Sequence, residues 1–229
     1  MGRWTAERWA AASGIAFVAA IVVSILMPGE SPPDYNDKAS SIVSFLNGNH
    51  TALAWSALFS GLAIVFFLWF LGSLAATLRD AHQWRLASVA YAGGLITAAL
   101  GIAGDTLGLA NMRLAGSGGS PDVVRGLWEL QAFVYQRFAW PLIVLAGATT
   151  LAAYRSGAFP RWYAALGAIG VVLFALFAIS VKTTGFFSPA GAMPWIGFLA
   201  FFVWTLVTSF LLVQKAAPAA MPAAAAQPM

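Results

Sequence analysis

The chain has 229 residues, of which 60% are hydrophobic and only 9% are charged, and its formal net charge is +4. A soluble domain has about a quarter of its residues charged, so this composition excludes an ordinary water-soluble protein. A bilayer requires every backbone polar group to be satisfied internally, which leaves helices or closed barrels. The apolar runs are long and do not alternate, so helices are favoured.

Six apolar segments follow one another, each long enough for the roughly 20 residues that cross a hydrocarbon core. They cover residues 9–27, 52–78, 86–109, 127–154, 162–181 and 194–214. The first has an apolar run that is long for a signal peptide, and no small-residue cleavage site follows it, so we expect an uncleaved span. The prediction is an all-α polytopic transmembrane helix bundle over residues 1–215.

The longest connection, residues 28–50, begins with prolines and a glycine that interrupt any helix. Asp37 is then expected to cap a short helix that has Ile42, Val43 and Leu46 on one face. Such a helix would lie on the membrane or over the mouth of the bundle. A helix that serves only as a spacer is the alternative.

The helix of the fourth span is expected to begin above the membrane at Ser120-Pro121-Asp122, which offers a capping hydroxyl, a proline for the first turn and an acid near the positive helix end. Pro141 inside this span should bend it. At the end of the chain, residues 216–229 are mostly Ala and Pro without a periodic apolar face. We expect this tail to be disordered.

The basic residues between the spans predict the orientation. With the N-terminus in the cytoplasm, seven basic residues fall inside and four outside: Arg3, Arg8, Arg79, Arg85, Arg155, Arg161 and Lys215 against Lys38, Arg113, Arg125 and Lys182. Both termini are therefore expected in the cytoplasm. Because the basic residues are scattered between apolar runs, the bilayer surface is the expected partner and nucleic acid is not.

Polar groups inside lipid are energetically expensive, so they are the first candidates for function. Asp105 lies in the third span, and steps of four back from it reach Gly101, Thr97 and Gly93. Such a stripe of small residues permits close helix packing. We therefore expect Asp105 to face the interior of the bundle.

Arg137 lies in the fourth span at a matching depth. Asp105 is about 28 Å and Arg137 about 26 Å from the inner face, at a helical rise of ~1.5 Å per residue. The two spans are consecutive and antiparallel, so an ion pair between Asp105 and Arg137 is predicted. It would either lock the two spans together or form the floor of an outward-facing polar pocket.

Three further polar residues of the fourth span, Glu129, Gln131 and Gln136, would extend such a pocket outward. Arg125 and Glu129 are four residues apart, so a simple pair on the helix surface is the alternative for Glu129. The inner halves of the spans offer only isolated Ser and Thr residues.

Several common sites are missing from the sequence. It has no cysteine, and its two histidines, His50 and His82, are assigned to opposite faces of the membrane. No zinc, Walker or dinucleotide-binding motif occurs, and no second membrane aspartate could complete an aspartyl protease. We therefore expect no metal, no cofactor and no enzymatic activity.

The segment Arg155-Ser-Gly-Ala-Phe-Pro160-Arg161-Trp162, followed by Leu166-Gly167, resembles a family of multi-pass bacterial membrane proteins of actinobacterial type that is defined as a domain of unknown function. The N-terminal Arg8 to Ile15 span and the Asp34-Tyr35 to Asp37 segment fit the same resemblance. It implies six or seven spans in a bacterial plasma membrane and assigns no catalytic residue.

Three functions remain open from the sequence. The first is the binding or transport of a small molecule through an outward-facing polar pocket. The second is a structural or regulatory subunit that contacts another membrane protein through its small-residue faces. The third is a membrane enzyme acting on lipid, which the scarcity of ionisable groups disfavours.

Overall fold

The computed structural model describes residues 5–34, 36–182, 184–189 and 191–216, and this part of the chain contains helices and no strand. The helices are α1 (Ala6–Leu26), α2 (Ala39–Gly48), α3 (His50–Asp80), α4 (Trp84–Gly116), α5 (Pro121–Arg137), α6 (Ala139–Ser156), α7 (Arg161–Ala178) and α8 (Ala192–Lys215). Six segments are long and apolar enough to cross a membrane, with α5 and α6 together forming one of them, Pro121–Ser156. The predicted all-α polytopic bundle is confirmed.

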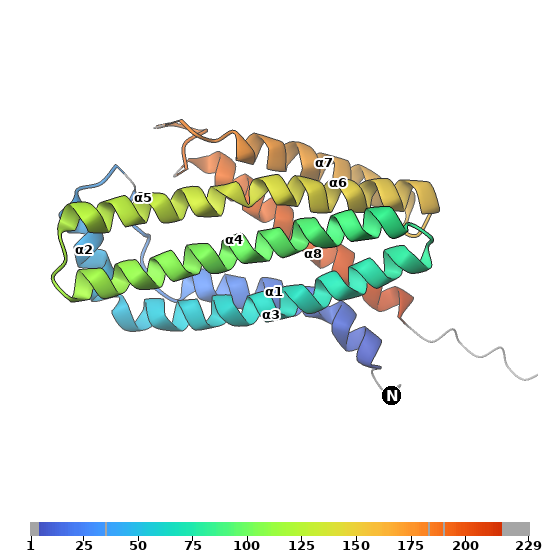
Figure 1. The fold of residues 1–229 in the computed structure, drawn as a ribbon, viewed down its shortest axis with the longest axis horizontal. Helices are drawn as coiled ribbons and strands as arrows, with labels where there is room; N and C mark the ends of the chain where they lie inside the picture. The colour runs from blue at the N-terminus through green and yellow to red at the C-terminus, as the bar shows by residue number, and fades with distance from the viewer. Residues whose placement is uncertain (1–4, 35, 183, 190, 217–229) are drawn as a thin grey trace, which may run out of the picture.

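The six long segments form a closed ring. Each packs against the next in chain order, and α8 returns to pack against α1. Figure 1 shows α3, α4 and α5–α6 side by side as one layer in front of α1, α7 and α8. The hydroxyl of Ser209 on α8 donates to the carbonyl of Ala11 on α1, so both ends of the described chain lie at one end of the bundle. We call this the terminal end, and the opposite one the α2 end.

Aromatic rings fill the middle of the ring of helices. Phe17 of α1, Phe67 of α3 and Phe201 of α8 have centroids 4.9, 5.6 and 5.8 Å apart. Trp204 is 1% exposed beside Phe70. Lipid is as apolar as these side chains, so the helices are held by van der Waals packing rather than by exclusion of water.

The fourth span is interrupted where the sequence predicts a bend. Pro141 has no N–H, so it cannot donate to the carbonyl of Arg137, and its ring would clash with that carbonyl in a regular helix. The structure ends α5 at Arg137 and begins α6 at Ala139. The predicted start of this span at Pro121 is also confirmed, although the hydroxyl of Ser120 makes no capping hydrogen bond.

The predicted short helix is α2, and it lies across the α2 end of the bundle (Figure 1). Ile42, Phe45 and Leu46 are buried on its inner face against Ala115 of α4 and Val124 of α5. Of the two expected positions, α2 therefore occupies the one over the mouth of the bundle.

The predicted cap of α2 is wrong. Lys38 occupies the N-cap position, and no side chain caps the helix. The carboxylate of Asp37 instead accepts the backbone N–H of Asp34 at 2.9 Å. Asp37 is therefore already engaged in the preceding turn and is not available to the first turn of α2.

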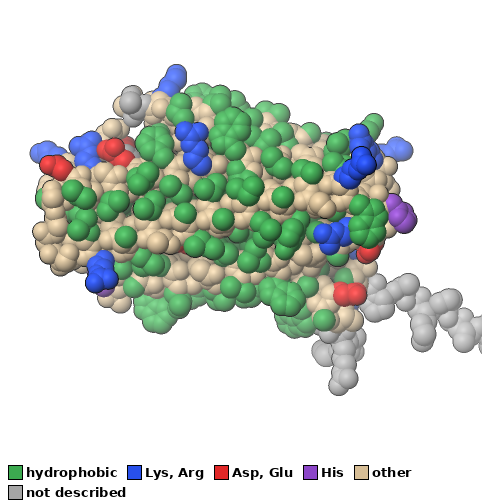
Figure 2. Space-filling view, viewed as in Figure 1, with side chains coloured by type: hydrophobic (Ala, Val, Ile, Leu, Met, Phe, Trp, Pro, Cys, Tyr) green, Lys and Arg blue, Asp and Glu red, His purple; other side chains and the backbone are tan. Residues whose placement is uncertain are grey.

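Hydrophobic side chains cover the middle of the face seen in Figure 2, and most charged side chains gather at its two ends. Such a band is what a hydrocarbon core requires. The predicted disorder concerns a tail that, apart from Ala216, lies outside the described residues.

Candidate functional site

Asp105 is half-buried in the half of α4 nearer the α2 end, between the flanking helices α3 and α5. The hydroxyl of Ser60 on α3 donates to Oδ2 of Asp105 at 2.5 Å. The hydroxyl of Tyr135 on α5 donates to Oδ1 at 2.5 Å. Each carboxylate oxygen thus accepts a hydrogen bond from a different helix, and one side chain links three spans.

The predicted ion pair between Asp105 and Arg137 is absent. In the described part of the chain the ion pair that forms joins Arg125 and Glu129, and the side chain of Arg137 is exposed. A helix turns by about 100° per residue, so positions two apart point to nearly opposite faces. Because Tyr135 faces Asp105, Arg137 faces away from it at a similar depth.

Asp105 also points in a different direction from the one that the small-residue stripe predicts. Steps of four rotate by about 40° more than a full turn, so three such steps drift by about 120° around the helix. The stripe that begins at Gly93 therefore no longer lies on the same helix face as Gly93 when it reaches Asp105. A Cβ on Gly93 would lie 2.8 Å from backbone atoms of α6, whereas the nearest neighbour of Gly101 is Ile64 of α3, at 3.9 Å. Asp105 shares that α3-facing side, which is why it meets Ser60.

Two glycines of α4 set the distance to α5. A Cβ on Gly104 would lie 2.5 Å from the ring of Tyr135, and one on Gly108 would lie 2.6 Å from Nε2 of Gln131. The glycines are four residues apart on α4, and their partners are four residues apart on the antiparallel α5. This close approach allows the hydroxyl of Tyr135 to reach past Gly104 to Asp105.

Buried amide oxygens lie further along these helices. Asn111 of α4 is fully buried. Its Nδ2 donates to the backbone carbonyl of Val124 at 3.0 Å. Its Oδ1 has no partner in the described part of the chain, and neither does Oε1 of Gln131. An amide whose nitrogen already donates presents its oxygen as an acceptor. Two buried acceptor oxygens without a protein partner therefore lie on the α2 side of Asp105.

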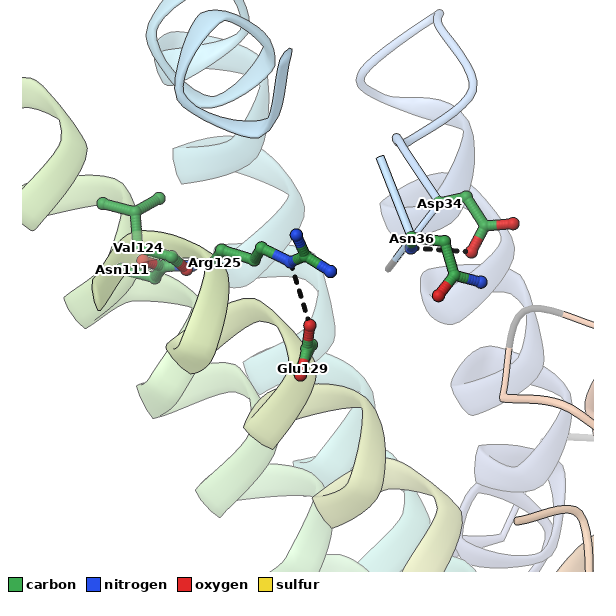
Figure 3. A network of polar contacts seen from close by, with 6 residues as sticks. All are labelled: Asp34, Asn36, Asn111, Val124, Arg125 and Glu129. Atoms are coloured by element: carbon green, nitrogen blue, oxygen red, sulfur yellow. Dashed lines mark hydrogen bonds and ion pairs between the residues drawn. The ribbon is translucent and has the colours of Figure 1, made fainter. Parts of the chain in front are cut away.

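The structure separates the three residues predicted to extend the pocket. Gln131 faces α4 one turn from Tyr135, so it does lie near Asp105. Gln136 instead donates to the carbonyl of Ser180, just beyond the end of α7. Glu129 pairs with Arg125 at 3.1 Å, with both side chains about 40% exposed, which confirms the alternative of a surface pair. Figure 3 shows this pair on α5, with Arg125 pointing toward the segment that carries Asp34 and Asn36.

Ser60 and Tyr135, the two direct partners of Asp105, were not found from the sequence. Tyr135 is four residues from Gln131 and seven from Trp128, so the face of α5 that meets α4 could have been traced by helical period. Ser60 carries no comparable signal, because a single serine is common in apolar helices.

The expectation of isolated hydroxyls in the inner halves is also corrected. Near the terminal end, the hydroxyls of Tyr163 on α7 and Thr208 on α8 lie 2.8 Å apart and are fully buried. Thr205 and Ser209 are fully buried on the same stretch of α8. Tyr163 is 45 residues from Thr208 in the sequence, and the packing of the consecutive helices α7 and α8 brings the two hydroxyls together. All are neutral, and this cluster offers no charge.

Asp105 is thus a single carboxylate with two neutral hydrogen-bond donors. Within the described residues no three acidic or histidine side chains gather as a set of metal ligands. One carboxylate can anchor a cationic group. Comparison with known proteins found no matching family model, no matching curated protein and no matching solved structure.

Proposed function

We propose that this is a non-enzymatic protein of a bacterial plasma membrane that binds a small cationic molecule in the outer half of its bundle. Asp105 is the anchoring anion. The observation that carries the proposal is that both hydrogen bonds to this carboxylate come from neutral hydroxyls, those of Ser60 and Tyr135. No Lys, Arg or His of the described chain forms an ion pair with it.

The unpaired charge of Asp105 has an unfavourable free energy. A buried ion without a counter-ion is disfavoured by several kcal/mol, even after the protein relaxes around it. Two hydroxyl hydrogen bonds offset part of that penalty, because bonds to charged groups contribute about 1.5–3 kcal/mol each. A bound cation would offset the rest and would stabilise the folded protein.

The neighbouring groups favour an ammonium-type ligand. An ammonium group donates several hydrogen bonds and accepts none. The unpartnered oxygens of Asn111 and Gln131 lie on the α2 side of Asp105 and could accept such bonds from a longer molecule. With both termini in the cytoplasm, this side is the outer one. The site would then be loaded from outside the cell, for binding alone or as the first step of transport.

The test is thermal unfolding of the purified protein in detergent, with chloride salts of sodium, tetramethylammonium, ethanolammonium and putrescine added separately. At least one cation should raise Tm, because a ligand at about 100 times its Kd stabilises the folded state by ~2.7 kcal/mol. Asp105→Asn should abolish the shift. Arg137→Gln is the matched control, since it removes a charge of similar depth that does not touch the carboxylate, and it should keep the shift.

A shift that is equal in wild type and Asp105→Asn, or no shift with any of these cations, would contradict the proposal. Asp105 would then act only as a polar link between α3, α4 and α5, as in the structural function that the sequence leaves open.

A further inference from the structure

A groove runs along the surface of the bundle near its terminal end, between the start of α7 and the last turns of α8. Its volume is about 520 Å³, within the ~300–1,000 Å³ typical of ligand pockets. Leu206, Phe210 and Leu211 of α8 and Trp162 of α7 form apolar walls, and Gln214 adds a polar group. Trp162 and Phe210 are 54% and 57% exposed, so the groove opens on the lipid-facing surface rather than into the bundle.

Two basic residues are sequence neighbours of residues that line this groove. Arg161 immediately precedes Trp162, Lys215 immediately follows Gln214, and both side chains are exposed. The ammonium of Lys215 lies 4.9 Å from the centre of the Phe159 ring, a cation–π contact that holds the charge next to the start of α7.

These cations have no acidic partner nearby in the sequence. Glu129 is the last acidic residue of the chain, so α6, α7 and α8 carry none. In the described part of the chain, neither Arg161 nor Lys215 forms an ion pair. The groove therefore combines an apolar surface with an uncompensated positive charge.

We propose that this groove binds one anionic phospholipid. An acyl chain lies against Leu206 and Phe210, and the phosphate lies between Arg161 and Lys215. The apolar walls exclude a free phosphate ion as the natural occupant, and the two cations select an anionic headgroup over a zwitterionic one. The indole of Trp162 suits the boundary between chain and headgroup, because it is apolar with one polar N–H. This site is separate from Asp105 and does not depend on the cation proposal.

The experiment measures lipid binding by native mass spectrometry of the detergent-purified full chain. Phosphatidylglycerol and phosphatidylcholine with identical acyl chains are titrated in parallel. The wild type should prefer phosphatidylglycerol for its first bound lipid by at least fivefold. The double variant Arg161→Gln/Lys215→Gln should bring this preference within twofold. Both residues are exposed, so the variant should fold as the wild type does.

A matched control removes the same charge from the same end of the molecule. Arg79→Gln/Arg85→Gln alters α3 and α4, away from the groove, and should keep the preference. Leu206→Trp, which fills the groove, should weaken the first binding event of both lipids. Inorganic phosphate at millimolar concentration should not compete.

Four results would overturn the proposal. The wild type could show no preference between the two lipids. The Arg79/Arg85 control could lose the preference as fully as the groove variant, which would assign it to the overall charge of this end. Inorganic phosphate could displace the lipid. Leu206→Trp could leave the binding of both lipids unchanged, and the acyl chain would then not lie in the groove.

Discussion

Asp105 gains its position from side chains on both flanking helices. Ser60 reaches it from α3 and Tyr135 reaches it from α5, past the glycine at position 104. The resulting link depends on direction around the helix as much as on depth. Arg137, two residues beyond Tyr135, has the right depth and the wrong direction.

Double-mutant cycles should separate these two neighbours. Asp105→Asn and Tyr135→Phe should be coupled by about 0.5–1.5 kcal/mol, because the first removes the charge of the acceptor and the second removes the donor of the same hydrogen bond. Asp105→Asn and Arg137→Gln should be additive within about 0.5 kcal/mol. Unfolding by a denaturing detergent measures both cycles. Strong coupling of Asp105 to Arg137, with none to Tyr135, would reverse the assignment.

Glycines of the bundle should differ sharply in their tolerance of a methyl group. A Cβ on Gly93 would lie 2.8 Å from the backbone N of Leu145 and the carbonyl of Pro141, and backbone cannot move aside as a side chain can. Gly93→Ala should therefore destabilise by about 1–3 kcal/mol, the usual range for overpacking.

Gly72→Ala is the control for this change, since a Cβ there has no neighbour within 4 Å. It should leave the stability unchanged or raise it slightly, because alanine favours helix by up to about 1 kcal/mol. Equal losses at positions 72 and 93, measured as Tm in detergent, would contradict the close approach of α4 and α6.

At the scale of the element, α2 is an amphipathic helix that depends on the bundle for its apolar contacts. Ile42 is fully buried, and Phe45 and Leu46 are nearly so, whereas Ser41, Ser44 and Asn47 are exposed. A ten-residue helix is marginal by itself, so its order should depend on this one face.

Ile42→Ala should release α2 without unfolding the spans. Removing a buried isoleucine destabilises by about 2–5 kcal/mol, and each 1.4 kcal/mol is a factor of ten in an opening equilibrium. Hydrogen exchange of residues 39–48 should therefore accelerate by at least tenfold, while exchange in α3 and α8 stays as in the wild type. Asn47→Ala, on the exposed face, should change neither. Unchanged hydrogen exchange of α2 in the Ile42 variant would show that α2 does not depend on this apolar face for its order.

The elements differ in how far the sequence predicts them. The spans follow from long apolar runs, and the break near Pro141 follows from a missing donor, so both could be predicted locally. The N-cap of α2 could not be predicted in this way. The carboxylate of Asp37 had two possible backbone partners, and it accepts the N–H of Asp34 in the preceding turn rather than an N–H of α2. To predict the partners of Asp105, the rotation of three helices about their axes must be known to within a fraction of a turn. Steps of four residues drift around the helix, so they no longer mark one face after a few turns.

For the whole molecule, an even number of spans places both described ends of the chain at one end of the bundle. The same arrangement places Ser31, Ser117 and Thr184, all exposed, at the α2 end. Ser156, the last residue of α6, lies at the terminal end. The hydroxyls of Tyr163 and Thr208 meet through the packing of α7 against α8, and no local pattern predicts this contact.

Cysteine labelling tests the orientation of this ring. The chain has no native cysteine, so single cysteines at positions 31, 117 and 184 can be compared directly with one at 156. The positive-inside distribution predicts that an impermeant thiol reagent labels the first three on intact cells and labels the fourth only after permeabilisation. The opposite pattern would invert the topology and place the Asp105 half of the bundle toward the cytoplasm.

The central claim is that the carboxylate of Asp105 lacks a counter-ion and binds one from solution. Isothermal titration calorimetry of the detergent-purified protein, with the cation that raises Tm most, measures this directly. We expect saturable binding with one site per chain in the wild type and in Arg137→Gln, and no measurable binding in Asp105→Asn. Equal binding in the wild type and in Asp105→Asn would contradict it.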